Sequence, residues 1–100
     1  MAKVIISPQA LEDMDNIAEY ITKDSPRYAG RMIERFLERI ASLEKLPQIG
    51  RKVPEVNHEN IRELLEGIYR IIYEIIDADH IDILTIHHGN RLLSNSPAFR

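Results

Sequence analysis

The sequence contains no cysteine, and it has no uninterrupted apolar run of about 18 residues. The missing cysteines exclude a disulfide framework, a thiolate metal site and a cysteine nucleophile. The missing apolar run excludes a membrane-spanning helix, and residues 1–8 are too short for the apolar region of a signal peptide. We therefore expect a cytoplasmic protein that is neither secreted by that route nor inserted in a membrane.

A surplus of basic residues is also missing. Thirteen lysines and arginines stand against sixteen aspartates and glutamates, which gives a formal net charge of -3. Because proteins that contact many phosphates usually carry a basic surplus, a large polyanion is a poor first candidate for the partner, although a local basic patch stays open. With 100 residues, of which 44% are hydrophobic, we expect one compact domain spanning residues 1–100.

Two helix starts share one signal, a serine followed by proline, in Ser7-Pro8 and Ser25-Pro26. Serine suits the N-cap, and proline suits the first helical position, where an N–H is not needed. Apolar residues then recur every three or four positions, which predicts one helix to about Thr22 and a longer helix that ends before Pro47. A short link between the two predicts an antiparallel helical hairpin.

The remaining segments predict strands and loops. A short strand is expected at Val4–Ile6, and residues 47–60 read as a surface loop. A strand over residues 61–65 and a long hairpin that turns at residues 77–80 follow, before an irregular tail. The predicted fold is α+β, with two layers in the order β-α-α-β-β-β.

The long hairpin has a register that can be predicted from its turn. Closure through either a two-residue loop at Ala78-Asp79 or a four-residue loop from Asp77 to His80 places Arg70 opposite His87 and Tyr69 opposite His88. Alternation then assigns two faces to the hairpin. The core face is predicted to carry Ile71, Tyr73, Ile75, Leu84 and Ile86. The second face is predicted to carry Arg70, Ile72, Glu74, Ile76, Ile81, Ile83, Thr85 and His87.

The second face mixes aliphatic and ionisable side chains, so we expect something to cover it. One candidate is a partner protein, and the other is the C-terminal segment with Leu92, Leu93 and Phe99. The adjacent histidines do not form a metal site, because neighbouring strand residues point to opposite faces. We expect no cofactor.

Several short motifs, taken in order, resemble one protein family over roughly residues 4–92. The matching pieces are Ser7-Pro8-Gln9-Ala10, Ile17-Ala18-Glu19-Tyr20-Ile21, Ser25-Pro26, Leu46-Pro47-Gln48-Ile49-Gly50-Arg51, Val53-Pro54-Glu55, Arg62-Glu63, Tyr69-Arg70-Ile71-Ile72-Tyr73 and Ile83-Leu84-Thr85-Ile86-His87-His88 with Arg91. Their order and spacing resemble the RelE/ParE superfamily of toxins from type II toxin–antitoxin systems, and the ParE-like, plasmid-stabilisation branch in particular.

This resemblance implies a toxin that is silenced by a cognate, ParD-like antitoxin and that inhibits DNA gyrase. A ribosome-dependent mRNA endoribonuclease of the RelE type is the alternative, and a degenerate toxin that only binds its antitoxin is another. RelE-like enzymes often carry a C-terminal tyrosine and a lysine-rich stretch. Here the tail ends Phe99-Arg100 and the basic stretch is reduced to Arg51-Lys52, which disfavours the nuclease.

The candidate site residues follow from the hairpin and from the resemblance. For a nuclease, Arg70 would stabilise the developing phosphorane charge, His87 would transfer a proton and Glu55 would act as a base. Alternatively, Arg70 pairs with Glu74 or with an acid of the tail, while His87 closes the sheet. The residues expected to contact a partner are Arg51, Lys52, Arg70, Ile72, Ile76, Ile81, Ile83, His87 and Arg91.

Overall fold

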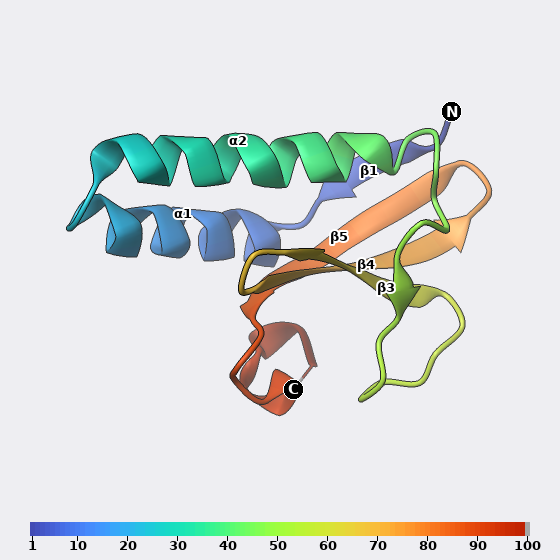
Figure 1. Cartoon of the computed structure of the whole chain (residues 1–100). Coiled ribbons are helices and arrows are strands. Elements are labelled where there is room, and N and C mark those ends of the chain that lie inside the picture. The colour runs from blue at the N-terminus through green and yellow to red at the C-terminus, as the bar shows by residue number, and fades with distance from the viewer. Residues whose placement is uncertain (100) are drawn as a thin grey trace.

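The computed structural model describes residues 1–99 and consists of two helices packed on one face of a mixed sheet (Figure 1). The elements in chain order are β1 (Lys3–Ile6), α1 (Pro8–Thr22), α2 (Pro26–Ser42), β2 (Arg51–Lys52), β3 (Ile61–Glu66), β4 (Tyr69–Asp77), β5 (His80–His88) and the 3-10 turns η1 (Leu93–Asn95) and η2 (Pro97–Phe99). The predicted α+β fold is confirmed, and the two-residue strand β2 is an addition to it. The tail was predicted to be irregular as far as Arg100, a residue that lies outside the described ones.

The sheet has the strand order β1-β5-β4-β3-β2. β2, β3, β4 and β5 pair antiparallel with their neighbours, whereas β1 pairs parallel with β5, an arrangement that the long segment between these two strands permits. Beyond β1, the free edge of β5 is closed by the start of α1. The Ser7 hydroxyl donates to the Leu84 carbonyl, and the Asp13 carboxylate accepts from the Ile86 N–H.

Both helices begin where the sequence predicts. The Ser7 hydroxyl accepts from the Ala10 N–H at 3.0 Å, and the Ser25 hydroxyl accepts from the Tyr28 N–H at 3.1 Å. Each serine thereby satisfies a backbone donor that the helix leaves unpaired, and a proline occupies the position after it. α2 ends at Ser42, before Pro47 as predicted.

The main core lies between the helices and the sheet. Phe36 and Tyr69 meet edge to face with ring centroids 5.5 Å apart. The other buried members come from both layers and are Ala2, Ala10, Met14, Met32, Ile40, Leu43, Leu64, Ile71, Tyr73, Ile81, Ile83 and Ile86.

The predicted hairpin register is confirmed at its open end and at the Asp77–His80 pair beside the turn, and it is wrong by one residue between them, from Tyr73 to Ile75. Arg70 pairs with His87 and Ile72 pairs with Thr85, but Tyr73 pairs with Ile83 and not with Leu84. A β-bulge inserts one extra residue here, and such a slip moves the following side chains to the other face. Ile81 and Ile83 therefore lie under the helices, where they are fully buried, while Leu84 packs on the second face.

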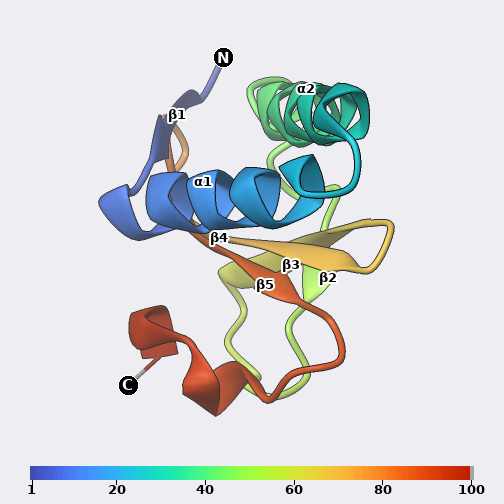
Figure 2. The same cartoon turned by 90° about the vertical axis from the view of Figure 1, so that its left-hand side faces the viewer.

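The second face of the sheet is covered in part by the chain itself. Val53, from the loop after β2, and Leu93, from η1, pack on Ile72. Figure 2 shows the C-terminal turns on the side of the sheet that faces away from α1 and α2. The predicted C-terminal cover is thus formed by Leu93 with half-buried Phe99, whereas Leu92 is exposed.

Candidate functional site

Three strands bring charged side chains together on the second face. In the register of the sheet, Arg51 of β2 lies beside Glu63 of β3, and Glu63 lies beside Ile72 of β4, two residues from Arg70. Residues two apart on a strand share a face, so Arg51, Glu63 and Arg70 converge. Glu55, from the loop after β2, completes the Arg–Glu cluster, which consists of these four residues.

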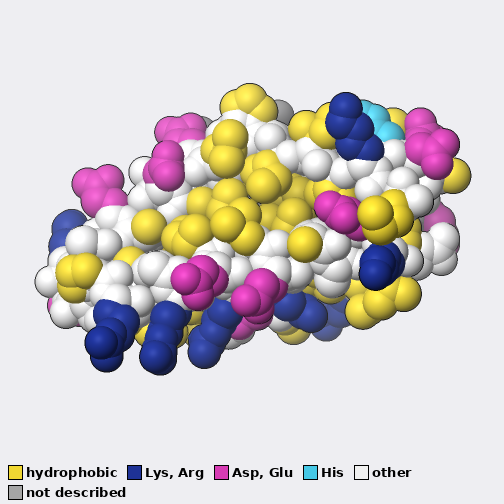
Figure 3. Space-filling view, turned by 90° about the horizontal axis from the view of Figure 1, so that it is seen from above, with side chains coloured by type: hydrophobic (Ala, Val, Ile, Leu, Met, Phe, Trp, Pro, Cys, Tyr) yellow, Lys and Arg dark blue, Asp and Glu magenta, His cyan; other side chains and the backbone are white. Residues whose placement is uncertain are grey.

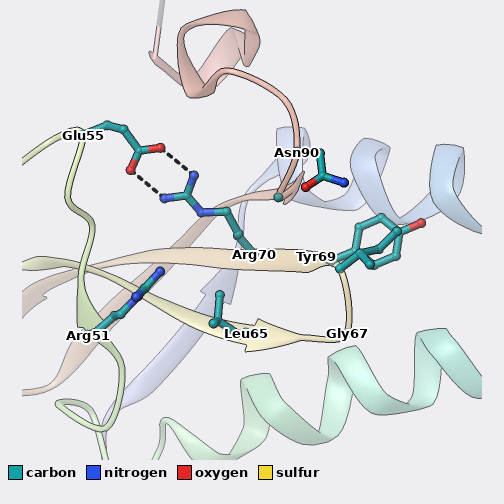
Figure 4. Close-up of a pocket in the computed structure, with 9 residues that line it drawn as sticks. Arg51, Glu55, Leu65, Gly67, Tyr69, Arg70 and Asn90 are labelled. Atoms are coloured by element: carbon teal, nitrogen blue, oxygen red, sulfur yellow. Dashed lines mark hydrogen bonds and ion pairs between the residues drawn. The ribbon is translucent and has the colours of Figure 1, made fainter.

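The Arg–Glu cluster is a continuous chain of charge-assisted hydrogen bonds. Arg70 donates from Nε to Glu63 at 2.6 Å and from its two Nη atoms to both oxygens of Glu55 at 2.6 and 2.8 Å. The second oxygen of Glu63 accepts from Arg51 Nε at 2.7 Å. Figure 4 shows the fork of Arg70 facing the carboxylate of Glu55. The planar guanidinium suits such bidentate pairing, which also fixes the loop against β4.

Burial differs sharply within the Arg–Glu cluster. The side chain of Glu63 is 0% exposed and that of Arg70 is 9% exposed, whereas those of Glu55 and Arg51 are 47% and 61% exposed. The hydrogen bonds from Arg70 lower the pKa of Glu55 to about 2, and the same carboxylate raises the pKa of Arg70. The two glutamates and two arginines of the cluster have no net charge together. The negative charge of the buried Glu63 carboxylate is therefore compensated by Arg70 and Arg51.

A second contact holds the loop that leads into β2. The Tyr73 hydroxyl accepts from the Gly50 N–H at 2.9 Å and donates to the Pro47 carbonyl at 2.8 Å. Burial raises the pKa of Tyr73. A Cβ at Gly50 would stand 2.6 Å from both the Tyr73 hydroxyl and the Glu63 carbonyl, so only glycine permits this approach.

A pocket of about 360 Å³ opens beside the Arg–Glu cluster. Its lining combines Arg51, Glu55 and Arg70 with the apolar side chains of Leu65 and Ile68, both of which are exposed. A second groove of about 560 Å³ shares Ile68 and Tyr69 with this pocket and continues past His88 and Arg91. The two hollows form one strip across the open end of the β4–β5 hairpin.

The residues proposed for ribonuclease chemistry are adjacent but engaged. Arg70 and His87 lie opposite each other as predicted, and His87 Nε2 lies 3.1 Å from the Arg91 carbonyl oxygen. The partners of Arg70 are Glu55 and Glu63, so the prediction of Glu74 or a tail acid as its partner is wrong. A carboxylate with a pKa of about 2 is a weak base near neutral pH, which makes Glu55 poorly suited to proton abstraction.

The residues predicted to contact a partner divide by accessibility. Arg51, Lys52, Ile76 and Arg91 are exposed. By contrast, Ile72, Ile81 and Ile83 are fully buried, and Arg70 and His87 are nearly so. The three isoleucines cannot meet a partner in this conformation, because Leu93 and Val53 cover Ile72 and the bulge turns the other two toward the helices.

Glu63 was not predicted from the sequence as a site residue. One signal in the sequence could have identified Glu63. It is a charged residue on a short strand, and the alternation of side chains places it on the same face of the sheet as its neighbour Ile72. A buried carboxylate needs a cationic partner, which would have pointed to the Arg70 that lies nearby on β4.

Among residues 1–99, no group of three or more histidine, cysteine, aspartate or glutamate side chains could hold a metal ion. None of the helices in this range is both long enough and apolar enough to cross a membrane.

Comparisons with known proteins agree with this architecture. The family model described as the ParE toxin of type II toxin-antitoxin system, parDE, matches residues 4–93. A solved structure of the chromosomal ParDE TA system from P. aeruginosa superposes with a TM-score of 0.71 at 22% identity, covering 88% of this chain and 96% of that one, and shows the same fold. A comparison with curated proteins found no significant match. The family match over most of its length shows that the chain belongs to the ParE toxin family of type II toxin–antitoxin systems.

Proposed function

We propose that this toxin acts in the cytoplasm by inhibiting DNA gyrase and that a ParD-like antitoxin neutralises it. The observation that carries the proposal is the family match across residues 4–93. The engaged state of Arg70 and Glu55 also favours a toxin that binds its target over one that cleaves RNA, because Arg70 is already paired with two carboxylates and Glu55, with a pKa of about 2, is a weak base near neutral pH.

The exposed part of the predicted contact surface suits a partner chain that runs along the two hollows. Arg51 stands at one end of this strip and Arg91 at the other, with the exposed apolar Leu65 and Ile68 between them. An apolar centre with a charged rim is typical of protein interfaces. We assign this strip to the antitoxin.

Expression in a bacterial host tests the proposal. Induction of the chain alone should arrest growth, and plasmid DNA from the arrested cells should be relaxed, since gyrase introduces the negative supercoils. Co-expression of the antitoxin from the neighbouring reading frame should restore both growth and supercoiling. The double variant Leu65→Asp/Ile68→Asp tests the assignment of the strip. If the strip binds only the antitoxin, this variant should still arrest growth, but co-expression of the antitoxin should no longer restore growth.

Two results would contradict the proposal. Cuts at codon-defined positions inside translated messages, with plasmids still supercoiled, would assign the toxin to ribosome-dependent RNA cleavage. Normal growth with abundant folded protein would indicate a degenerate toxin that retains only antitoxin binding.

A further inference from the structure

Helix α2 carries four regularly spaced arginines, of which only the last contacts the rest of the fold within residues 1–99. Arg27, Arg31, Arg35 and Arg39 follow one another at intervals of four residues, which places successive side chains about 6 Å apart along one side of the helix. Figure 3 shows Lys and Arg side chains in a row along one edge of the helix-covered face. The arginine row, defined as Arg27, Arg31 and Arg35, is exposed.

The arginine row is unpaired within the described chain. Only Arg39 turns back to the sheet, where it donates to the Leu65 carbonyl and lies 3.9 Å from Glu66. Among residues 1–99, no ion pair joins a carboxylate to any of the other three arginines of α2. Glu34 and Glu38 stand three residues after Arg31 and Arg35, within reach on the helix, yet no bond forms between them.

The order of charges on α2 also works against the stability of the helix. Each arginine of the row has another arginine four residues away, and Glu34 has Glu38 at the same spacing. Like charges at this spacing destabilise a helix, whereas alternating signs would stabilise it. A helix whose charge pattern lowers its stability, without a contact that compensates for the loss, is typical of a functional surface.

The charge of the arginine row stands out against that of the whole chain. Four arginines less two glutamates give α2 a charge of +2, so a chain of net charge -3 carries -5 elsewhere. The positive potential of the arginine row therefore attracts anions. The negative charges of Glu34 and Glu38 weaken this potential to the side of the row, so the attraction is strongest along the row itself. The amino end of α2, where Arg27 lies, adds the positive end of the helix dipole.

From this arrangement we propose that the arginine row binds the phosphate backbone of duplex DNA. The half-exposed Tyr28 lies three residues before Arg31 on the same side, and tyrosine hydroxyls join arginines in contacting phosphates. A protein partner would need an apolar centre. The exposed Leu37 cannot supply one, because it lies two residues from Arg35 and so points to another side of the helix.

The inference concerns the chain's own surface and is independent of whether gyrase is the target. It is tested with the full-length protein and a fluorescein-labelled DNA duplex of mixed sequence, by fluorescence anisotropy at several salt concentrations. Three phosphate contacts predict that the logarithm of the binding constant falls with the logarithm of salt with a slope of about -2.7.

Two variants of equal net charge separate the arginine row from general electrostatics. Arg31→Gln/Arg35→Gln should reduce the magnitude of the salt slope by about 2 and weaken binding roughly tenfold or more at low salt. Lys3→Gln/Lys45→Gln removes the same charge from exposed positions elsewhere and should change affinity less than about twofold. Equal losses in the two variants would overturn the inference, as would a wild-type protein that binds poly-glutamate but not the duplex.

A stability measurement tests the electrostatic strain separately. Arg31→Gln removes a like charge four residues from both Arg27 and Arg35 and adds none beside Glu34, so the thermal midpoint should rise by about 2 °C while DNA binding weakens. A fall in the midpoint with folded protein would contradict the strain argument.

Discussion

Replacing Glu63 by glutamine should destabilise this protein more than any other single charge removal in the Arg–Glu cluster. Its carboxylate is fully buried and accepts from both Arg70 and Arg51. Glutamine keeps the volume, but it removes the negative charge and turns an NH₂ group toward one guanidinium. Breaking a buried pair on one side typically costs about 3–5 kcal/mol, so we expect a loss of about 3 kcal/mol.

Glu55 provides the internal comparison. It binds Arg70 through two bonds, yet its side chain is 47% exposed, so solvent screens the interaction. Glu55→Gln should therefore cost only about 1 kcal/mol. Urea unfolding at pH 7 measures both values, and the thermal midpoint of Glu63→Gln should fall by about 12 °C or more.

A double-mutant cycle tests whether the Arg–Glu cluster acts as one unit. Replacing Glu63 by leucine and Arg70 by methionine together should cost less than the sum of the two single changes, because neither charge is then left buried alone. A loss below about 1 kcal/mol for Glu63→Gln, or strictly additive losses in the cycle, would refute the reasoning.

Further predictions concern pH, the tyrosine contact and the tail. Because Arg70 lowers the pKa of Glu55 from 4.5 to about 2, its stabilisation is present above pH 4.5 and is lost as the pH falls toward 2. The difference in unfolding free energy between the wild type and Glu55→Gln should therefore vanish across that range in a urea titration. Tyr73→Phe leaves the Gly50 N–H unpaired and should cost about 1–3 kcal/mol, with faster amide hydrogen exchange at Gly50. Leu93→Ala should cost about 2–3 kcal/mol and increase the binding of a hydrophobic dye, since it uncovers Ile72; an unchanged dye signal would show that η1 does not seal the second face.

The helices were predictable because their signals are local. The Ser7 and Ser25 caps and the apolar spacing that follows each of them involve residues within four positions of one another. The hairpin register at Arg70 and His87 matches the prediction only because two irregularities cancel: the pairing shifts by one residue between Asp77 and Ile75 and shifts back between Tyr73 and Ile72. Between these two points the strict alternation fails, because a bulge leaves no sign in the apolar pattern of either strand.

The Arg–Glu cluster could be predicted only in part. Arg70 was recognised as a site residue from its predicted place opposite His87 on the second face of the hairpin. Its partners were missed, because Glu55 lies on an aperiodic loop and Glu63 reaches Arg70 only through the pairing of β3 with β4. The sequence also did not decide whether the chain itself or a partner covers Ile72. The residue that covers it, Leu93, is about 20 residues away in sequence and lies in a tail without periodicity.

The most direct test of the proposed activity is a supercoiling reaction with purified gyrase, relaxed plasmid and ATP. Micromolar toxin should block supercoiling or trap cleaved plasmid DNA, and prior addition of the antitoxin should abolish the effect. Full supercoiling at that concentration, with toxin shown to be folded and to bind its antitoxin, would contradict gyrase as the target.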